Sequence, residues 1–233
     1  MNALEKLMTE GELAVTGRLV DASNATLFGT IVSGDEEVRV IYKPIAGERP
    51  LWDFADGNLA QREYAAYLVS EFGGWNLVPL TILREGPFGA GMVQQWIDID
   101  ETIDLSLYYR ENNASLREMA LFDAVVNNTD RKIGHLIPTV EGKLFGCDHG
   151  VTFHEEDKLR TVLWQWSSQP LSNEENNRLK NLLWIIKSEE KLLTGLISEK
   201  EFKALIGRVE RLLTEGTFPE PSDQWPAVPW PPF

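Results

Sequence analysis

The sequence has a single cysteine, Cys147, among 233 residues, so no disulfide can form within the chain. Its start also lacks a basic segment followed by an apolar stretch, which is the pattern of a secretory signal. The longest apolar runs are far shorter than a membrane span. We therefore expect a soluble globular protein of the cytoplasm, with no stable insertion into a membrane.

Basic residues are scarce: 22 Lys and Arg stand against 36 Asp and Glu, which gives a formal net charge of −14. Nucleic-acid binding needs a broad positive surface that neutralises phosphates, so a nucleic-acid partner is not expected. An anionic substrate such as a nucleotide would need individually placed cations or a metal ion. The Walker A pattern is also absent from the sequence, which excludes a P-loop route to ATP.

The first hundred residues are predicted to form a sheet interrupted by one helix. Five segments are predicted to be strands: 12–20, 25–33, 37–43, 77–85 and 89–97. Gly34 and Asp35 form the predicted hairpin turn of an antiparallel meander. Apolar residues at helical spacing over 57–74, ending at two glycines, predict a helix between the third and fourth strands.

The remainder is predicted to be mainly helical. Three Ser-x-x-Glu capping boxes mark helix starts, at Ser115 and Glu118, Ser172 and Glu175, and Ser198 and Glu201. We expect an α+β fold of two lobes: a β-rich lobe over 1–97, an α-rich lobe over 98–216, and a Pro/Trp-rich tail over 217–233. The tail is interpreted as a strap over the domain's own surface, with a docking segment as the alternative.

The stretch 122–154 holds Asp130, Asp148 and all three histidines of the chain. A short strand pair between Asp130 and Asp148 would bring both carboxylates to one cleft, where they could bind a divalent cation or divide into a base and a metal ligand. Arg131 would keep the Asp130 carboxylate ionised or bind an anionic group. Lys43 would contact phosphate oxygens, and Glu63 could pair with it. Taken one at a time, each of these would be interpreted as an ordinary polar residue on the surface.

Taken together, "YKP" before "REYAAYLVSE", then "LFDAVVNNTDRKIGHL" and "LFGCDHGVTF", resemble the phosphatidylinositol 3- and 4-kinase-like superfamily. The similarity is greatest to type II phosphatidylinositol 4-kinases and HipA-type bacterial kinases, and it covers roughly residues 15 to 155. It implies a protein-kinase-like fold that binds ATP and Mg²⁺ or Mn²⁺. In that fold Lys43 would hold the ATP phosphates, Glu63 would hold Lys43, Asp130 would be the catalytic aspartate and Asp148 would bind the metal.

The resemblance also implies which segments of the chain would contact the nucleotide. Segment 21–29 would be the turn that covers the phosphates, with Ser23 and Asn24 in contact with them, although it is poorer in glycine than usual. Gln94, Gln95 and Trp96 would form the hinge whose backbone pairs with adenine. In the family an Asn usually stands five residues after the catalytic Asp, as second metal ligand, and here that place is His135. Because Mg²⁺ prefers oxygen, His135 favours Mn²⁺, a water-mediated role or a weak site.

Several readings follow for the function. The first is a kinase that transfers the terminal phosphoryl group of ATP to a hydroxyl of a polyol, a lipid head group or a protein; AMP transfer is a variant of it. The second is a nucleotide-binding pseudokinase. The third is a metal-dependent hydrolase, whose ligands would be Asp130, His135, Asp148, His149 and His154. His149 could instead have a structural role between the lobes.

Overall fold

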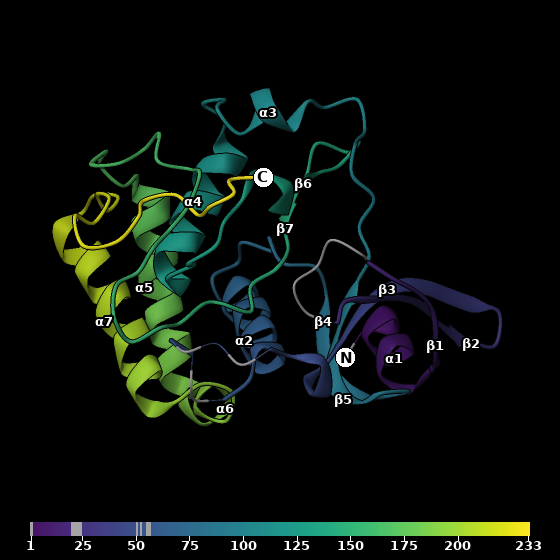
Figure 1. The fold of residues 1–233 in the computed structure, drawn as a ribbon. Coiled ribbons are helices and arrows are strands. Elements are labelled where there is room, and N and C mark those ends of the chain that lie inside the picture. The colour runs from purple at the N-terminus through teal and green to yellow at the C-terminus, as the bar shows by residue number, and fades with distance from the viewer. Residues whose placement is uncertain (1, 20–24, 50, 52, 55–56) are drawn as a thin grey trace.

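The structure is a computed structural model that describes residues 2–19, 25–49, 51, 53–54 and 57–233. Figure 1 shows a β-rich N-terminal part beside a helical C-terminal part. The predicted phosphate-covering residues Ser23 and Asn24 lie outside the described residues. In the described part of the chain, no helix is long and apolar enough to cross a membrane.

The N-terminal part is an antiparallel sheet in the order β1-β2-β3-β5-β4. Its strands are β1 (Glu12–Arg18), β2 (Leu27–Ser33), β3 (Glu36–Pro44), β4 (Thr81–Gly86) and β5 (Gly89–Gln95). The turn between β2 and β3 is the predicted one, and Gly34 takes a φ of 61°, which glycine adopts without strain. Helix α1 (Ala3–Glu10) buries Leu7 and Met8 against one face of this sheet.

Helix α2 (Leu59–Phe72) joins the sheet to the helical part (Figure 1). Of the apolar residues at helical spacing, Leu68 is buried, while Tyr64, Tyr67 and Phe72 are only partly buried against the core. The buried face consists largely of small and charged residues: Ala60, Arg62, Glu63, Ala65, Ala66, Leu68, Val69 and Ser70. Alanines let neighbouring backbones approach closely. That close approach allows the buried carboxylate of Glu63 to reach a residue on the sheet.

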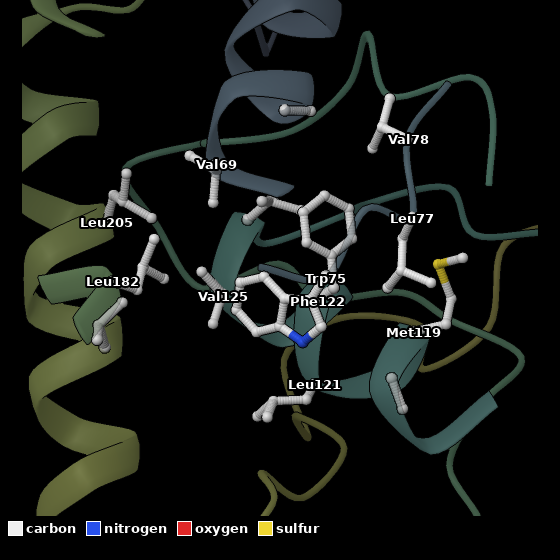
Figure 2. Close-up of a cluster of buried hydrophobic side chains, with 14 of the residues drawn as sticks. Val69, Trp75, Leu77, Val78, Met119, Leu121, Phe122, Val125, Leu182 and Leu205 are labelled. Carbon is white, nitrogen blue, oxygen red and sulfur yellow. The ribbon is translucent and has the colours of Figure 1, made fainter. Parts of the chain in front are cut away.

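The C-terminal part is built on helices α3 (Leu105–Tyr108), α4 (Ala114–Val126), α5 (Asn173–Ser188), α6 (Glu190–Thr194) and α7 (Glu199–Glu215). Two short strands, β6 (Leu136–Pro138) and β7 (Leu144–Gly146), form the predicted hairpin between α4 and α5. Helices α2, α4, α5 and α7 share one hydrophobic core around Trp75 and Phe122, whose rings meet edge to face (Figure 2). This core fixes α4 and the loop that follows it.

Two of the three predicted capping boxes are confirmed. Ser172 with Glu175, and Ser198 with Glu201, cap α5 and α7. The box at Ser115 and Glu118 is wrong, because the side chain of Asn113 caps α4 by accepting a hydrogen bond from Leu116 N–H. Asn is as good an N-cap as Ser, and it comes first in the chain.

The tail follows the helical part back toward the loop after α4 (Figure 1). The Ala227 carbonyl accepts hydrogen bonds from the Thr161 N–H at 3.0 Å and from Trp164 Nε1 at 2.8 Å, and Pro232 O accepts one from Ile133 N–H at 2.8 Å. The strap interpretation is therefore correct for most of the tail. It is wrong for Trp230, whose side chain is 89% exposed.

Candidate functional site

Lys43 stands at the centre of the site. Its Nζ lies 2.6 Å from Glu63 Oε1 and 2.8 Å from Asp148 Oδ1. Strand β3 supplies the lysine, α2 the glutamate and the turn after β7 the aspartate. The sequence prediction that Glu63 pairs with Lys43 agrees with this geometry. Its contact with Asp148 shows that three distant segments meet at one ammonium group.

The charges of this triad depend on one another. Burial alone would lower the pKa of Lys43, but the charges of Asp148 and Glu63 outweigh it and raise that pKa. The Lys43 charge in turn holds the pKa of Asp148 well below its usual range. Burial raises the pKa of Glu63, which Lys43 partly offsets. The site therefore holds a cation and an ionised Asp148 over the physiological pH range.

The turn that carries Asp148 is held from two sides. Asp148 has a φ of 62°, a left-handed conformation that Asp and Asn tolerate better than most residues. The next residue, His149, donates its backbone N–H to Glu63 Oε2 at 2.9 Å. Glu63 thus uses one oxygen for Lys43 and the other for the backbone beside Asp148.

Asp130 lies in the loop after α4. Its N–H donates to Asn128 Oδ1 at 3.0 Å, and its carboxylate lies 3.4 Å from Lys132 Nζ. Burial raises the pKa of Asp130; Lys132 lowers it, and Asp148 raises it further. Asp130, Lys43 and Asp148 line one cavity of about 590 Å³. The convergence of the two aspartates on one cleft is therefore present in the structure.

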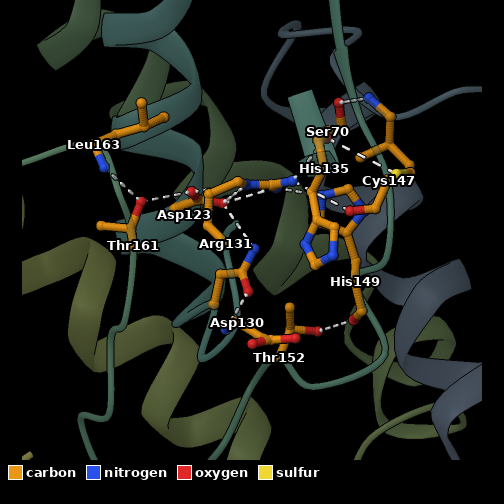
Figure 3. A network of polar contacts seen from close by, with 12 residues as sticks. Ser70, Asp123, Asp130, Arg131, His135, Cys147, His149, Thr152, Thr161 and Leu163 are labelled. Carbon is orange, nitrogen blue, oxygen red and sulfur yellow. Dashed lines mark hydrogen bonds and ion pairs between the residues drawn. The ribbon is translucent and has the colours of Figure 1, made fainter. Parts of the chain in front are cut away.

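Arg131 does not have the position expected of it. Its guanidinium is fully buried and donates to the Asp123 carboxylate at 2.9 to 3.2 Å and to the carbonyls of His135 and Cys147 (Figure 3). The cation beside Asp130 is Lys132, and Arg131 lowers the pKa of Asp130 only as the smallest of the contributions. The prediction that Arg131 binds an anionic group is wrong, because its buried guanidinium is occupied by Asp123. Asp123, the residue the sequence analysis missed, was detectable as a lone charge in the apolar run "ALFDAVV".

The three histidines have separate environments. His135 lies beside Asp148, with Nε2 at 3.5 Å from Asp148 Oδ2, and burial lowers its pKa to about 4, which leaves the ring neutral. His149 is fully buried, with Nε2 at 2.6 Å from Arg131 Nη2. Since arginine can only donate, this Nε2 accepts. His154 packs edge-on against Phe54 and contacts Lys158.

This arrangement contradicts the idea that the histidines cluster around one metal. His149 and His154 are turned to other partners, so the five-ligand hydrolase site does not assemble. Within the ranges that the structure describes, no group of three or more His, Cys, Asp or Glu side chains could hold a metal ion. The protein offers the pair Asp148 and His135, and a metal bound there would need further oxygen ligands from a substrate.

A second cavity, of about 330 Å³, lies on the other side of Lys43, below the end of β5. Its wall contains all three predicted hinge residues, Gln94, Gln95 and Trp96, together with apolar side chains and Asp148. Gln94 Nε2 donates to Thr81 Oγ1, while the N–H groups of Gln95 and Trp96 donate to the carbonyls of Leu80 and Arg39. The hinge residues thus line the cavity, and the backbone N–H groups of Gln95 and Trp96 are occupied.

No family model matches the chain. Protein Rv2133c of Mycobacterium tuberculosis (strain ATCC 25618 / H37Rv) is 38% identical in an alignment that covers 97% of this chain and 94% of the relative. The chain belongs to the Rv2133c family. This relationship covers almost the whole length of both proteins.

Solved structures share the fold at low sequence identity. The Golgi casein kinase with Mn/ADP bound superposes with a TM-score of 0.61 at 13% identity, covering 91% of this chain and 74% of that one. Hydra Fam20 with sugar gives a TM-score of 0.59 at 13% identity, covering 91% and 86%. The predicted fold class, α+β with a kinase-like arrangement of a β-rich and an α-rich part, is confirmed.

Proposed function

We propose that the protein is an ATP-dependent phosphotransferase that moves the terminal phosphoryl group of ATP to a hydroxyl group. One observation carries the proposal: Lys43 contacts both Glu63 and Asp148. Lys43 also lines both the 330 Å³ cavity beside Gln94, Gln95 and Trp96 and the 590 Å³ cavity that contains Asp130. A kinase site needs a phosphate-binding cation, a metal-binding carboxylate and a base across from them. The kinase-like fold and the Mn/ADP complex of the Golgi casein kinase support this reading.

The two cavities would hold different parts of the substrates. Adenine would occupy the apolar cavity beneath Gln95 and Trp96, and the phosphates would reach Lys43 at its inner end. The acceptor would enter the larger cavity, where the Asp130 carboxylate lies in the wall. In this arrangement the terminal phosphorus would lie between Lys43 and Asp130.

The residues present fit a Mg²⁺ or Mn²⁺ ion shared with the phosphates. Asp148 offers an ionised carboxylate oxygen. Neutral His135 would bind the metal through Nε2 in the tautomer that gives up the 3.4 Å hydrogen bond from Lys132 N–H to Nδ1. A metal held between these groups and the phosphates would neutralise negative charge on the transferred group. The nitrogen ligand favours Mn²⁺, since Mg²⁺ prefers oxygen.

Transfer then requires little covalent work from the protein. The acceptor oxygen attacks the terminal phosphorus, the bond to the bridging oxygen of ADP breaks, and the hydroxyl proton passes to the Asp130 carboxylate. Lys43 donates to phosphate oxygens while Glu63 holds it in place. The resemblance to phosphatidylinositol kinases remains an interpretation of the motifs around Asp130 and Asp148.

Thermal unfolding with ATP, with metal and with both tests the nucleotide site. A ligand at about 100 times its Kd stabilises by roughly 2.7 kcal/mol, which is several degrees for a chain of this size. We expect the wild type to shift only with ATP and metal together, and Asp148→Asn to lose that shift. A shift with metal alone, to which ATP adds nothing, would contradict the proposal.

Product analysis then separates the kinase from its alternatives. Asp130→Asn should bind ATP and metal like the wild type and should not transfer the phosphoryl group, which makes it the matched control for Asp148→Asn. ADP as product supports phosphoryl transfer, and pyrophosphate would indicate AMP transfer instead. Binding by the wild type without any product would identify a pseudokinase.

A further inference from the structure

Arg160 is a partly buried arginine without a carboxylate partner in this acidic chain. Arg117 pairs with Glu175 at 2.7 Å and Arg131 pairs with Asp123 at 2.9 Å. Across the part of the chain that the structure describes, no carboxylate lies within ion-pair distance of Arg160, and its Nε has no hydrogen-bond partner. The charge of Arg160 is therefore available to an anion from outside the chain.

The backbone of Arg160 is hydrogen-bonded to the loop after α4, which carries Asp130. Its N–H donates to Asn128 O at 2.9 Å, and its carbonyl accepts from Arg131 N–H at 3.1 Å. These two partners flank Asp130 on either side in the sequence. The side chain of Arg160 lines the 590 Å³ cavity together with Asp130 and Asp148. The arginine and the proposed base therefore face the same space.

The guanidinium of Arg160 also packs against an aromatic ring. Its central carbon lies 5.7 Å from the ring centroid of Trp225 in the tail, and Lys158 Nζ lies 4.4 Å from the same ring. Packing against an aromatic ring restricts the arginine side chain, while the N–H groups at its edge can still donate in the plane of the guanidinium. A guanidinium held in this way can donate to two oxygens of one anion.

We propose that Arg160 binds a phosphate or carboxylate group on a small, hydroxyl-bearing acceptor. The inference rests on the proposed phosphotransferase function, and it names the substrate class of that site. Its guanidinium matches the two oxygens of such a group, and the anion would hold the acceptor hydroxyl toward Asp130. A cavity of about 590 Å³ has the size of small-molecule sites, which span roughly 300 to 1,000 Å³.

Inorganic phosphate is the first probe, titrated by calorimetry into protein saturated with ADP and Mn²⁺. We expect Arg160→Gln to weaken phosphate binding by about tenfold or more, and Arg160→Lys to weaken it less. Lys180→Gln, on the exposed face of α5, is the matched charge-removing control and should bind phosphate like the wild type. Unliganded melting temperatures of both Arg160 variants show whether the fold is intact.

The nucleotide arm separates this inference from the proposed function. ADP and Mn²⁺ should bind equally well to the wild type and to Arg160→Gln. Weaker nucleotide binding by Arg160→Gln would place the arginine on the ATP phosphates and overturn the acceptor assignment. Absence of ADP binding in the wild type would sink the kinase proposal by itself, and phosphate titrated without nucleotide would then test Arg160 alone.

The size class of the acceptor is tested with matched probes. Glycerol 3-phosphate and glycerate carry the anion and a hydroxyl, whereas glycerol carries hydroxyls alone. We expect binding of at least one anionic probe, dependent on Arg160, and no binding of glycerol. Phosphate binding that is equal in Arg160→Gln and the wild type overturns the inference, and so does binding of an acidic serine peptide but of neither small anion.

Discussion

Glu63 and His149, 86 positions apart, are joined by a hydrogen bond of 2.9 Å from the His149 N–H to Glu63 Oε2. The other oxygen of Glu63 lies 2.6 Å from Lys43 Nζ. On the far side of His149, the ring contacts Arg131, which is bound in turn to Asp123. One polar chain therefore runs from the sheet through α2, the turn after β7 and the loop after α4 to α4 itself.

Glu63→Gln tests the first link of this chain. The amide keeps an oxygen that can accept from His149 but loses the charge that holds Lys43. We expect kcat/KM for ATP-dependent transfer to fall by about a hundredfold, comparable to the loss of one group that stabilises the transition state. Steady-state kinetics measure it. Glu71→Gln, at an exposed position of the same helix, is the control and should leave kcat/KM unchanged.

Asp123→Asn tests the last link. Removing one partner of a fully buried ion pair leaves an uncompensated charge, so the free energy of unfolding should fall by about 3 to 5 kcal/mol. Urea denaturation provides the value. The exposed pair of Lys187 and Glu210 is the comparison, and Glu210→Gln should change stability by less than about 1 kcal/mol. Equal losses in the two variants would show that Arg131 does not depend on Asp123.

The pH dependence of transfer should report on Asp130. The base must be ionised, and burial raises its pKa, so kcat/KM should fall as the pH falls through a value above the usual range of an Asp. Because the Lys132 charge lowers the pKa of Asp130, Lys132→Met should move the acid limb to higher pH. A limb that stays in place in Lys132→Met, or that moves equally in Lys180→Met, would show that another group titrates.

His135→Asn tests the choice of metal. Asn offers an oxygen in place of the imidazole nitrogen, and Mg²⁺ prefers oxygen. We expect the ratio of Mn²⁺ to Mg²⁺ affinity, measured from metal-dependent thermal shifts in the presence of ADP, to fall by about tenfold. An unchanged ratio would mean that His135 does not contact the metal.

The strands and the contact between Lys43 and Glu63 followed from local sequence. Alternating apolar residues and the Gly34 turn define the meander, and a lone Lys43 at the end of a strand with Glu63 on the next helix predicted a pair that the structure contains. These features depend on neighbours in the chain or on charges too costly to bury alone. Physical reasoning can read both from one sequence.

The fate of Arg131 could not be read in this way. Its neighbour in sequence is Asp130, but its partner in space is Asp123, in the last turn of α4, and only the packing of the loop on that helix decides between them. The same holds for His149 and His154, which are near His135 in sequence and face other surroundings. Side-chain direction in a loop is set by tertiary contacts, which spacing does not encode.

The left-handed backbone at Asp148 has an evolutionary consequence. A β-branched or bulky residue would be strained at a φ of 62°, whereas Asn and Gly fit there readily. A lineage that gave up metal binding could therefore drift to Asn or Gly at this position without disturbing the fold. Homologues with either residue here would be natural counterparts of the engineered Asp148→Asn, and the proposed function predicts that they do not transfer the phosphoryl group.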